Sequence, residues 1–313
     1  MLKPGETAMS LLPNSTMPGV QAFAACAEPH VSLWRTLLGL VVIVLVYLQV
    51  TLLGLAAWIS LSTLLTNGQA DLSLTGQLAR PVIAGLLASL GMLIPAVWVV
   101  TRMLHNRSLQ SVIGPDGLRW GSYLLGAGAV LVIAGALSGL SMVTTPITPN
   151  ASVTALLWWF VPMTVLLMLQ TGAEELVFRG YLQQQLSARF RSPWIWWVLP
   201  SILFGAMHFD QSSFGSNAWL PAAAAAVMGL ILGDVTARTG NLSAAMGMHL
   251  ANNMVALFLL SLPSSLSTFA LFTLDIDLND TNAVRISLLG SVLVLIVFYG
   301  IYLGVIAWRS RQR

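Results

Sequence analysis

Two adjacent acids and an arginine lie at the end of a long apolar stretch, where ionisable groups are costly and commonly serve proton relays or catalysis. These residues are Glu174, Glu175 and Arg179. In a helix, Glu175 and Arg179 share one face, with the acid on the N-terminal side as a favourable ion pair requires. Glu174 is rotated by about 100° from Glu175 and points elsewhere. We therefore predict that one acid is paired and the other is available, with an interfacial charge cluster as the alternative.

Two histidines and an asparagine interrupt other apolar stretches. His208 follows Phe204 by four residues, and His249 precedes Asn253 by four, so each pair shares a helix face. A single His at the end of a membrane span is commonly interfacial, and a His and Asn pair can hold membrane helices together. The occurrence of two acids, one Arg and two His on three different predicted helices nevertheless indicates a common site.

The elements that position these residues are predicted to be membrane helices. The 313-residue chain is 57% hydrophobic and 8% charged, its mean hydropathy is +0.82, and an average soluble domain is roughly 25% charged. The apolar runs are long and continuous, which indicates helices. The basic residues are scattered, which excludes nucleic acid as a partner. We predict an all-α, polytopic membrane bundle whose partner is the lipid bilayer.

Charge-free intervals predict about eight spans, because a helix that crosses a bilayer needs about 20 apolar residues. A turn cluster at residues 144–150 divides the longest interval. The predicted spans are residues 36–61, 81–101, 121–143, 154–173, 193–209, 218–236, 243–264 and 286–308. The fourth span has an extension to Leu186 as an alternative. Residues 1–34 are predicted to be a poorly ordered cytoplasmic tail, and residues 35–313 to form the transmembrane domain.

The Lys and Arg residues predict the orientation of these spans. With a cytoplasmic N-terminus, eleven of the 14 basic residues lie at cytoplasmic ends, Arg80 and Arg285 lie outside, and Arg179 lies within the membrane. Both termini are therefore predicted to be cytoplasmic, and the acidic loop at residues 275–280 to lie outside. This arrangement is typical of a multi-pass protein of a bacterial inner (cytoplasmic) membrane.

Three motifs, in this order on successive predicted helices, resemble those of a known family. They are Glu-Glu-x-x-x-Arg at 174–179, Phe-x-x-x-His at 204–208 and His-x-x-x-Asn at 249–253. The pattern resembles the CPBP family, also called the Abi family, which comprises CAAX prenyl proteases and bacteriocin-processing or self-immunity proteins. The connecting segments 229–233 and 238–242 are similar to that family too. The resemblance covers about residues 155–260, the predicted protease core.

The resemblance implies an intramembrane endopeptidase of the CAAX prenyl protease type, acting on a membrane-associated protein or peptide. It implies that Glu174 is the general base and that His208 helps to hold or deprotonate the water. His249 and Asn253 would stabilise the tetrahedral oxyanion. The supporting residues are Glu175, Arg179 and Phe204.

The catalytic type is open between two alternatives. Glu174, His208 and His249 make a set of two His and one carboxylate that a catalytic zinc could use, with water in its open position. A metallo-endopeptidase of this kind would lack a separate base, because Glu175 is predicted to pair with Arg179. A glutamic endopeptidase that requires no cofactor is therefore favoured, and zinc is the alternative.

Other protease types and other functions fit the sequence less well. No His-Glu-x-x-His occurs, Ile231 breaks the Gly-x-Gly-Asp pattern before Asp234, and Ser138 is not within Gly-x-Ser-Gly. These differences disfavour site-2, aspartyl and rhomboid proteases. A proton-coupled membrane transporter is an alternative, although a proton relay does not need an amide such as Asn253. A non-catalytic immunity or scaffold protein of the same fold is a further alternative.

Overall fold

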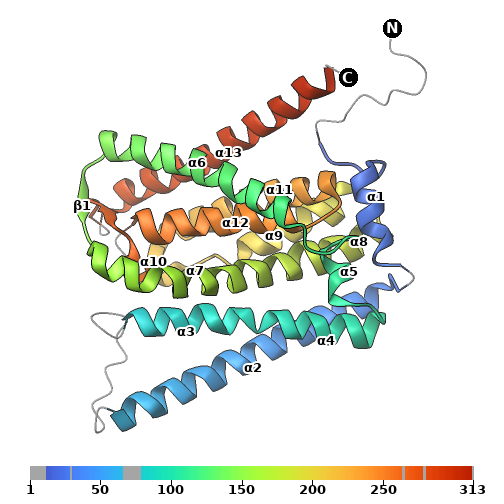
Figure 1. Ribbon diagram of the computed structural model, residues 1–313, viewed down its shortest axis with the longest axis horizontal. Coiled ribbons are helices and arrows are strands. Elements are labelled where there is room, and N and C mark those ends of the chain that lie inside the picture. Colours follow the sequence, from blue (N-terminus) through green and yellow to red (C-terminus); the bar gives the residue numbers. More distant parts are fainter. Residues whose placement is uncertain (1–11, 29, 66–78, 263–264, 278–279, 312–313) are drawn as a thin grey trace.

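The computed structural model describes residues 12–28, 30–65, 79–262, 265–277 and 280–311. Figure 1 shows long helices packed side by side, with a small sheet at one end of the bundle. In chain order the elements are α1 (Pro18–Ala25), α2 (Leu33–Leu65), α3 (Ala79–Gly91), α4 (Leu93–His105), α5 (Leu109–Ile113), α6 (Trp120–Thr144), β1 (Ile147–Pro149), α7 (Val153–Glu175), η2 (Leu176–Gln183), α8 (Gln184–Arg189), η3 (Trp194–Val198), α9 (Leu199–Ala206), α10 (Gln211–Phe214), η4 (Gly215–Asn217), α11 (Trp219–Thr239), α12 (Ser243–Met254), η5 (Val255–Leu259), β2 (Leu260–Ser261), η6 (Ser265–Phe269), β3 (Phe272–Leu274) and α13 (Thr281–Arg311).

Six helical segments in the described part of the chain are long and apolar enough to cross a membrane. They are Leu33–Ala57, Arg80–His105, Trp120–Val143, Val153–Arg189, Trp219–Thr239 and Thr281–Gly304. Large apolar side chains cover their outward faces, and Leu52, Val132 and Trp158 are 63%, 73% and 78% exposed. Such exposure is unfavourable in water and suits lipid. The predicted helical membrane bundle is therefore confirmed.

Two predicted spans are shorter than a bilayer crossing. The span predicted at 193–209 is the apolar helix Trp194–Ala206, which rises only about 20 Å against a hydrocarbon core of about 30 Å. The span predicted at 243–264 is α12 continued by η5, after which the chain becomes extended and Leu260 pairs with β3. In the described part of the chain the structure therefore has six helical segments long enough to cross a membrane, and at these two predicted spans it has shorter helical segments.

The fourth span is longer than residues 154–173. It runs as one helical segment from Val153 to Arg189, through α7, η2 and α8, in agreement with the alternative that extends it. Every residue from 175 to 186 is buried. This half of the segment is therefore surrounded by protein rather than lipid, which explains how a polar sequence can continue a membrane helix.

Part of the region predicted as a poorly ordered tail, residues 1–34, is the ordered helix α1. It begins with Pro18 at a first helical position, where the absent N–H is not needed. Val20 and Phe23 are buried, and α1 packs on α8 and α11. Gly19 permits this approach, because a Cβ there would lie 2.4 Å from the carbonyl oxygen of Ala237. Residues 1–11 and 29 lie outside the described residues.

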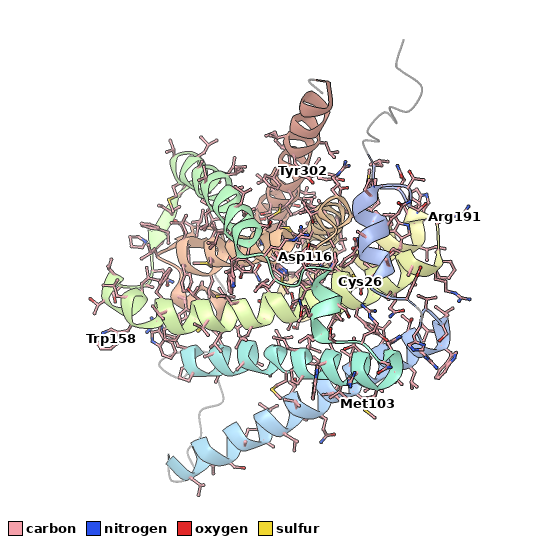
Figure 2. All side chains as sticks on the ribbon, turned by 45° about the vertical axis from the view of Figure 1, so that its right-hand side comes forward. Cys26, Met103, Asp116, Trp158, Arg191 and Tyr302 are labelled. Atoms are coloured by element: carbon pink, nitrogen blue, oxygen red, sulfur yellow. The ribbon has the colours of Figure 1, made fainter. Side chains whose placement is uncertain are left out.

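A three-stranded sheet is the exception to the all-α prediction. Its strand order is β1-β3-β2, with β1 antiparallel and β2 parallel to β3. The side-chain amide of Asn150, just after β1, donates to the carbonyl oxygens of Ser267 and Ala270, which precede β3, at 2.6 and 2.9 Å. We call this part of the bundle, with α10, the sheet end; α1, α5 and α8 form the opposite α5 end (Figure 1). In Figure 2 the two ends carry Trp158 and Arg191 respectively.

Candidate active site

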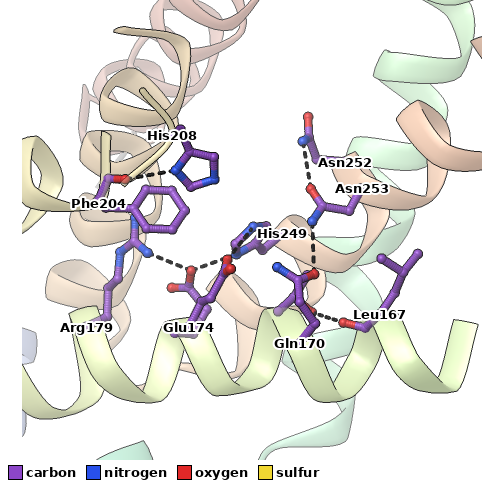
Figure 3. A network of polar contacts seen from close by, with 11 residues as sticks. Leu167, Gln170, Glu174, Arg179, Phe204, His208, His249, Asn252 and Asn253 are labelled. Atoms are coloured by element: carbon purple, nitrogen blue, oxygen red, sulfur yellow. Dashed lines mark hydrogen bonds and ion pairs between the residues drawn. The ribbon is translucent and has the colours of Figure 1, made fainter. Parts of the chain in front are cut away.

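The ring of Phe204 brings together side chains from three helical segments (Figure 3). It lies edge-to-face with His249 of α12, with ring centroids 5.8 Å apart, and 4.7 Å from the ring of His208. On η2, Phe178 packs edge-to-face on the same ring, and the Arg179 guanidinium lies 4.5 Å from its centroid. Phe204 thus contacts both histidines and covers the arginine with an aromatic face.

A buried chain of charged groups runs from η2 to α12. Arg179 Nη1 donates to Glu175 Oε1 at 2.7 Å, and His249 Nδ1 donates to the same oxygen at 2.9 Å. The predicted pairing of Glu175 with Arg179 is present, and both side chains are at most 1% exposed. Because a carboxylate only accepts, His249 carries a hydrogen on Nδ1. Glu175 therefore fixes the orientation of the imidazole, in the way that carboxylates orient catalytic histidines.

Glu174 stands beside this chain and is not paired with Arg179. Its Oε2 lies 3.6 Å from His249 Nε2, and its side chain is 13% exposed. This oxygen has no hydrogen-bond partner among the described residues. With a second proton on His249, two cations balance the two carboxylates, so the cluster can stay inside a membrane without net charge. The consecutive acids thus differ in their pairing with Arg179, but both approach His249, so Glu174 does not point away from this cluster.

Asn253 is held by two neighbouring amides. Its Nδ2 donates to Gln170 Oε1 at 3.3 Å, and its Oδ1 accepts from Asn252 Nδ2 at 3.2 Å. A second Nδ2 hydrogen remains for a ligand. The sequence analysis assigned no role to Gln170. Its position could have indicated a site residue, because it is an amide one turn before Glu174 in an apolar run. Its contribution depends on how α7 packs on α12.

His208 lies just past the end of α9 and is exposed. Its Nδ1 donates to the carbonyl oxygen of Phe204 at 2.9 Å, because a carbonyl only accepts. The neutral ring then presents Nε2 as an acceptor, which suits a group that holds water. The structure brings His208 to the Phe204 ring, whereas the histidine that approaches Glu174 closely is His249.

The donors predicted for zinc are not gathered around one point. Within the ranges described, no group of three or more His, Cys, Asp or Glu side chains is placed to hold a metal ion. Glu174 and His249 approach each other, and the Nδ1 bonds of His249 and His208 leave both Nε2 atoms free, but His208 is not gathered with the other two donors. The arrangement does not fit a three-ligand zinc site.

The region that holds the three motifs is similar to a known protein family. Residues 153–255 match the Rce1-like family of type II CAAX prenyl endopeptidases, and all three motifs lie in this range. The predicted family resemblance is thereby confirmed. An uncharacterized protein of Bacillus subtilis (strain 168), YyaK, is 26% identical over 244 residues, which is 75% of this chain and 80% of YyaK. No solved structure matches the chain.

Proposed function

We propose that this Rce1-like protein is an intramembrane endopeptidase that hydrolyses a peptide bond of a membrane-associated protein or peptide. One observation carries the proposal. Glu174 lies 3.6 Å from an oriented imidazole, while the adjacent Glu175 is bonded to both Arg179 and His249. One acid is thus committed to structure and the other is available to move a proton, as general base catalysis requires.

In the proposed reaction, Glu174 takes a proton from a water molecule that His208 Nε2 helps to hold. The water oxygen forms a bond to the carbonyl carbon of the substrate, and the carbonyl oxygen becomes an oxyanion. His249 Nε2–H and the second Nδ2–H of Asn253 donate to this oxyanion. When the C–N bond breaks, Glu174 returns its proton to the leaving amine. The products are a carboxyl group and an amine, and Glu174 is regenerated.

We also propose the finer topology. The segments Trp194–Ala206 and Ser243–Leu259 are short, yet each leads from the α5 end toward the sheet end. With the six long segments, the chain therefore crosses between the two ends of the bundle eight times. Both described termini then lie on one side, and Figure 1 shows α1 and the C-terminal end of α13 on the same side of the bundle. The Lys and Arg distribution makes that side cytoplasmic, and residues 155–260 form the protease core of a bacterial inner-membrane protein.

Mapping of protein termini tests the proposed function. Membrane proteins from cells with and without this protein are compared by mass spectrometry of their N- and C-terminal peptides. An endopeptidase produces matching pairs of new termini, from one cleaved bond, that occur only in cells with the protein. Identical sets of termini would favour a transporter or a non-catalytic scaffold instead.

We expect activity to be independent of metal. The donors for zinc do not converge, and Glu174 is needed as base rather than as ligand. Protein purified in detergent and treated with a zinc chelator should therefore cleave a substrate identified by terminal mapping as fast as untreated protein. Near-stoichiometric zinc in elemental analysis, with activity lost on chelation and restored by zinc, would establish the metallo-endopeptidase instead.

A further inference from the structure

A pocket with two arginines lies at the α5 end of the bundle, between α2 and α8. Its volume is about 420 Å³, within the range of small-molecule sites. The span Leu33–Ala57 begins at this pocket, and the span Val153–Arg189 ends there. The pocket therefore lies where membrane helices reach the lipid headgroups. We call it the α2–α8 pocket, and its lining residues are His30, Val31, Ser32, Trp34, Arg35 and Arg189.

The positive charges of the α2–α8 pocket are not balanced by described acids. Among the residues that the structure describes, neither Arg35 nor Arg189 forms a salt bridge, and no lining residue is acidic. Arg35 Nη1 donates to His30 Nδ1 at 2.9 Å, because a guanidinium has no acceptor. The hydrogen of the neutral His30 ring then lies on Nε2, which is a further donor. The lining thus offers two cations and a ring N–H to a negatively charged ligand.

The backbone of the α2–α8 pocket is held in place by two buried side chains. His105 Nδ1 donates to the carbonyl oxygen of His30 at 2.9 Å, and the Tyr181 hydroxyl donates to that of Arg35 at 3.3 Å. A site formed in advance loses less free energy to ordering when a ligand binds. Between these anchors, the Ser32 hydroxyl oxygen has no hydrogen-bond partner among the described residues, so it does not cap the start of α2 as a serine there usually does. The positive end of the α2 dipole therefore remains available to an anion.

We propose that the α2–α8 pocket binds the phosphate group of an anionic membrane lipid. The planar N–H groups of arginine match phosphate oxygens, and basic pockets between membrane helices bind anionic headgroups. The surface that continues from the pocket is apolar: Trp34, Leu37 and Val41 share one face of α2 and are 60%, 53% and 53% exposed. Acyl chains can lie along this face when the phosphate is in the pocket, whereas a soluble phosphate compound would leave it unused.

A bound phosphate connects two parts of the bundle. Arg35 is in α2, and Arg189 ends the helical segment that also contains Glu174. A ligand that contacts both arginines in the folded protein, and not in the unfolded chain, stabilises the fold by mass action. This binding does not depend on catalysis, so it can be measured whether or not the protein is an endopeptidase.

Lipid selection in nanodiscs tests the proposal. The full chain is placed in nanodiscs of phosphatidylcholine and phosphatidylglycerol in equal amounts, and the lipids that stay bound to it are identified by native mass spectrometry. We expect the wild type to retain phosphatidylglycerol in preference to phosphatidylcholine. The variant Arg35→Gln with Arg189→Gln should bind phosphatidylglycerol about 25-fold more weakly, because each arginine near an anionic headgroup contributes about fivefold.

The matched control is Arg102→Gln with Arg119→Gln, which removes two arginines near the same end of the bundle but outside the pocket. This control should keep the preference for phosphatidylglycerol. Arg35→Lys with Arg189→Lys retains both charges without the guanidinium fork, so its affinity should lie between those of the wild type and the glutamine variant. In phosphatidylcholine alone all three variants should melt close to the wild type, because none of these arginines belongs to a buried ion pair among the described residues.

Inorganic phosphate distinguishes a lipid from a soluble source of the same chemistry. In phosphatidylcholine nanodiscs, added phosphatidylglycerol should raise the melting temperature of the wild type and of the control, and inorganic phosphate should give a smaller rise because it does not use the apolar face of α2. An equal or larger rise with inorganic phosphate, lost in the glutamine variant, would show that the ligand is a soluble phosphate compound instead. Equal loss of lipid selection in the control would show that only the overall surface charge matters, and unchanged selection in the glutamine variant would overturn the proposal.

Discussion

Glu174→Gln is expected to abolish proteolysis while the protein remains folded and inserted. Glutamine keeps the size of the side chain but cannot take a proton from water, and a general base typically contributes about 10²- to 10⁴-fold to the rate. We therefore expect kcat to fall by about two to four orders of magnitude, with little change in KM. Because Glu174 is partly exposed and not paired with Arg179, its loss leaves the buried ion pair intact. The measurement is turnover of an identified substrate by protein with an unchanged melting temperature.

The matched control is Glu28→Gln, which removes an exposed carboxylate remote from the motifs and should leave turnover unchanged. Wild-type cleavage by the Glu174→Gln variant would contradict the assignment of the base. Loss of both turnover and folding would show that Glu174 is structural, which its single approach to His249 at 3.6 Å does not support.

Local geometry explains why part of the site could be predicted from the sequence. The pairing of Glu175 with Arg179 depends only on helical spacing, and the spacing is sufficient to predict it. The contact between Gln170 and Asn253 joins residues 83 positions apart. It depends on the packing of α7 against α12, which no local pattern specifies. The hydrogen bond from His249 to Glu175 could not be predicted from the sequence for the same reason.

The same distinction explains the differences in the fold. Apolar length identifies a helix with lipid on its surface, so the six long spans could be predicted. It does not show that residues 175–186 continue a helix through protein, because that depends on bonds to distant elements, such as those from Gln183 to Gly233 and from Gln184 to Ser111. Nor does it show where α9 and α12 end, since the ends depend on the turn after Ala206 and on the pairing of Leu260 with β3.

Glu175→Gln and Arg179→Ala are expected to destabilise the protein strongly. Each removes one partner of a pair whose side chains are at most 1% exposed, and breaking a buried pair costs about 3–5 kcal/mol because the remaining charge has no compensation. Arg179 Nη2 already lacks a hydrogen-bond partner among the described residues, so loss of Glu175 leaves the guanidinium supported mainly by the Phe204 ring. The expected result is a lower yield and a lower melting temperature in detergent, well below those of Glu174→Gln.

The double variant Glu175→Gln with Arg179→Met distinguishes two causes of lost stability: a buried charge without a partner and a general loss of packing. Both charges are then absent, and methionine fills much of the space beside Phe204, so stability should recover relative to Glu175→Gln alone. Activity should not recover with it, because Glu175 also orients His249 through the 2.9 Å bond to Nδ1. A double variant less stable than either single variant would show that the side chains act through packing, and full activity in it would show that His249 needs no orienting carboxylate.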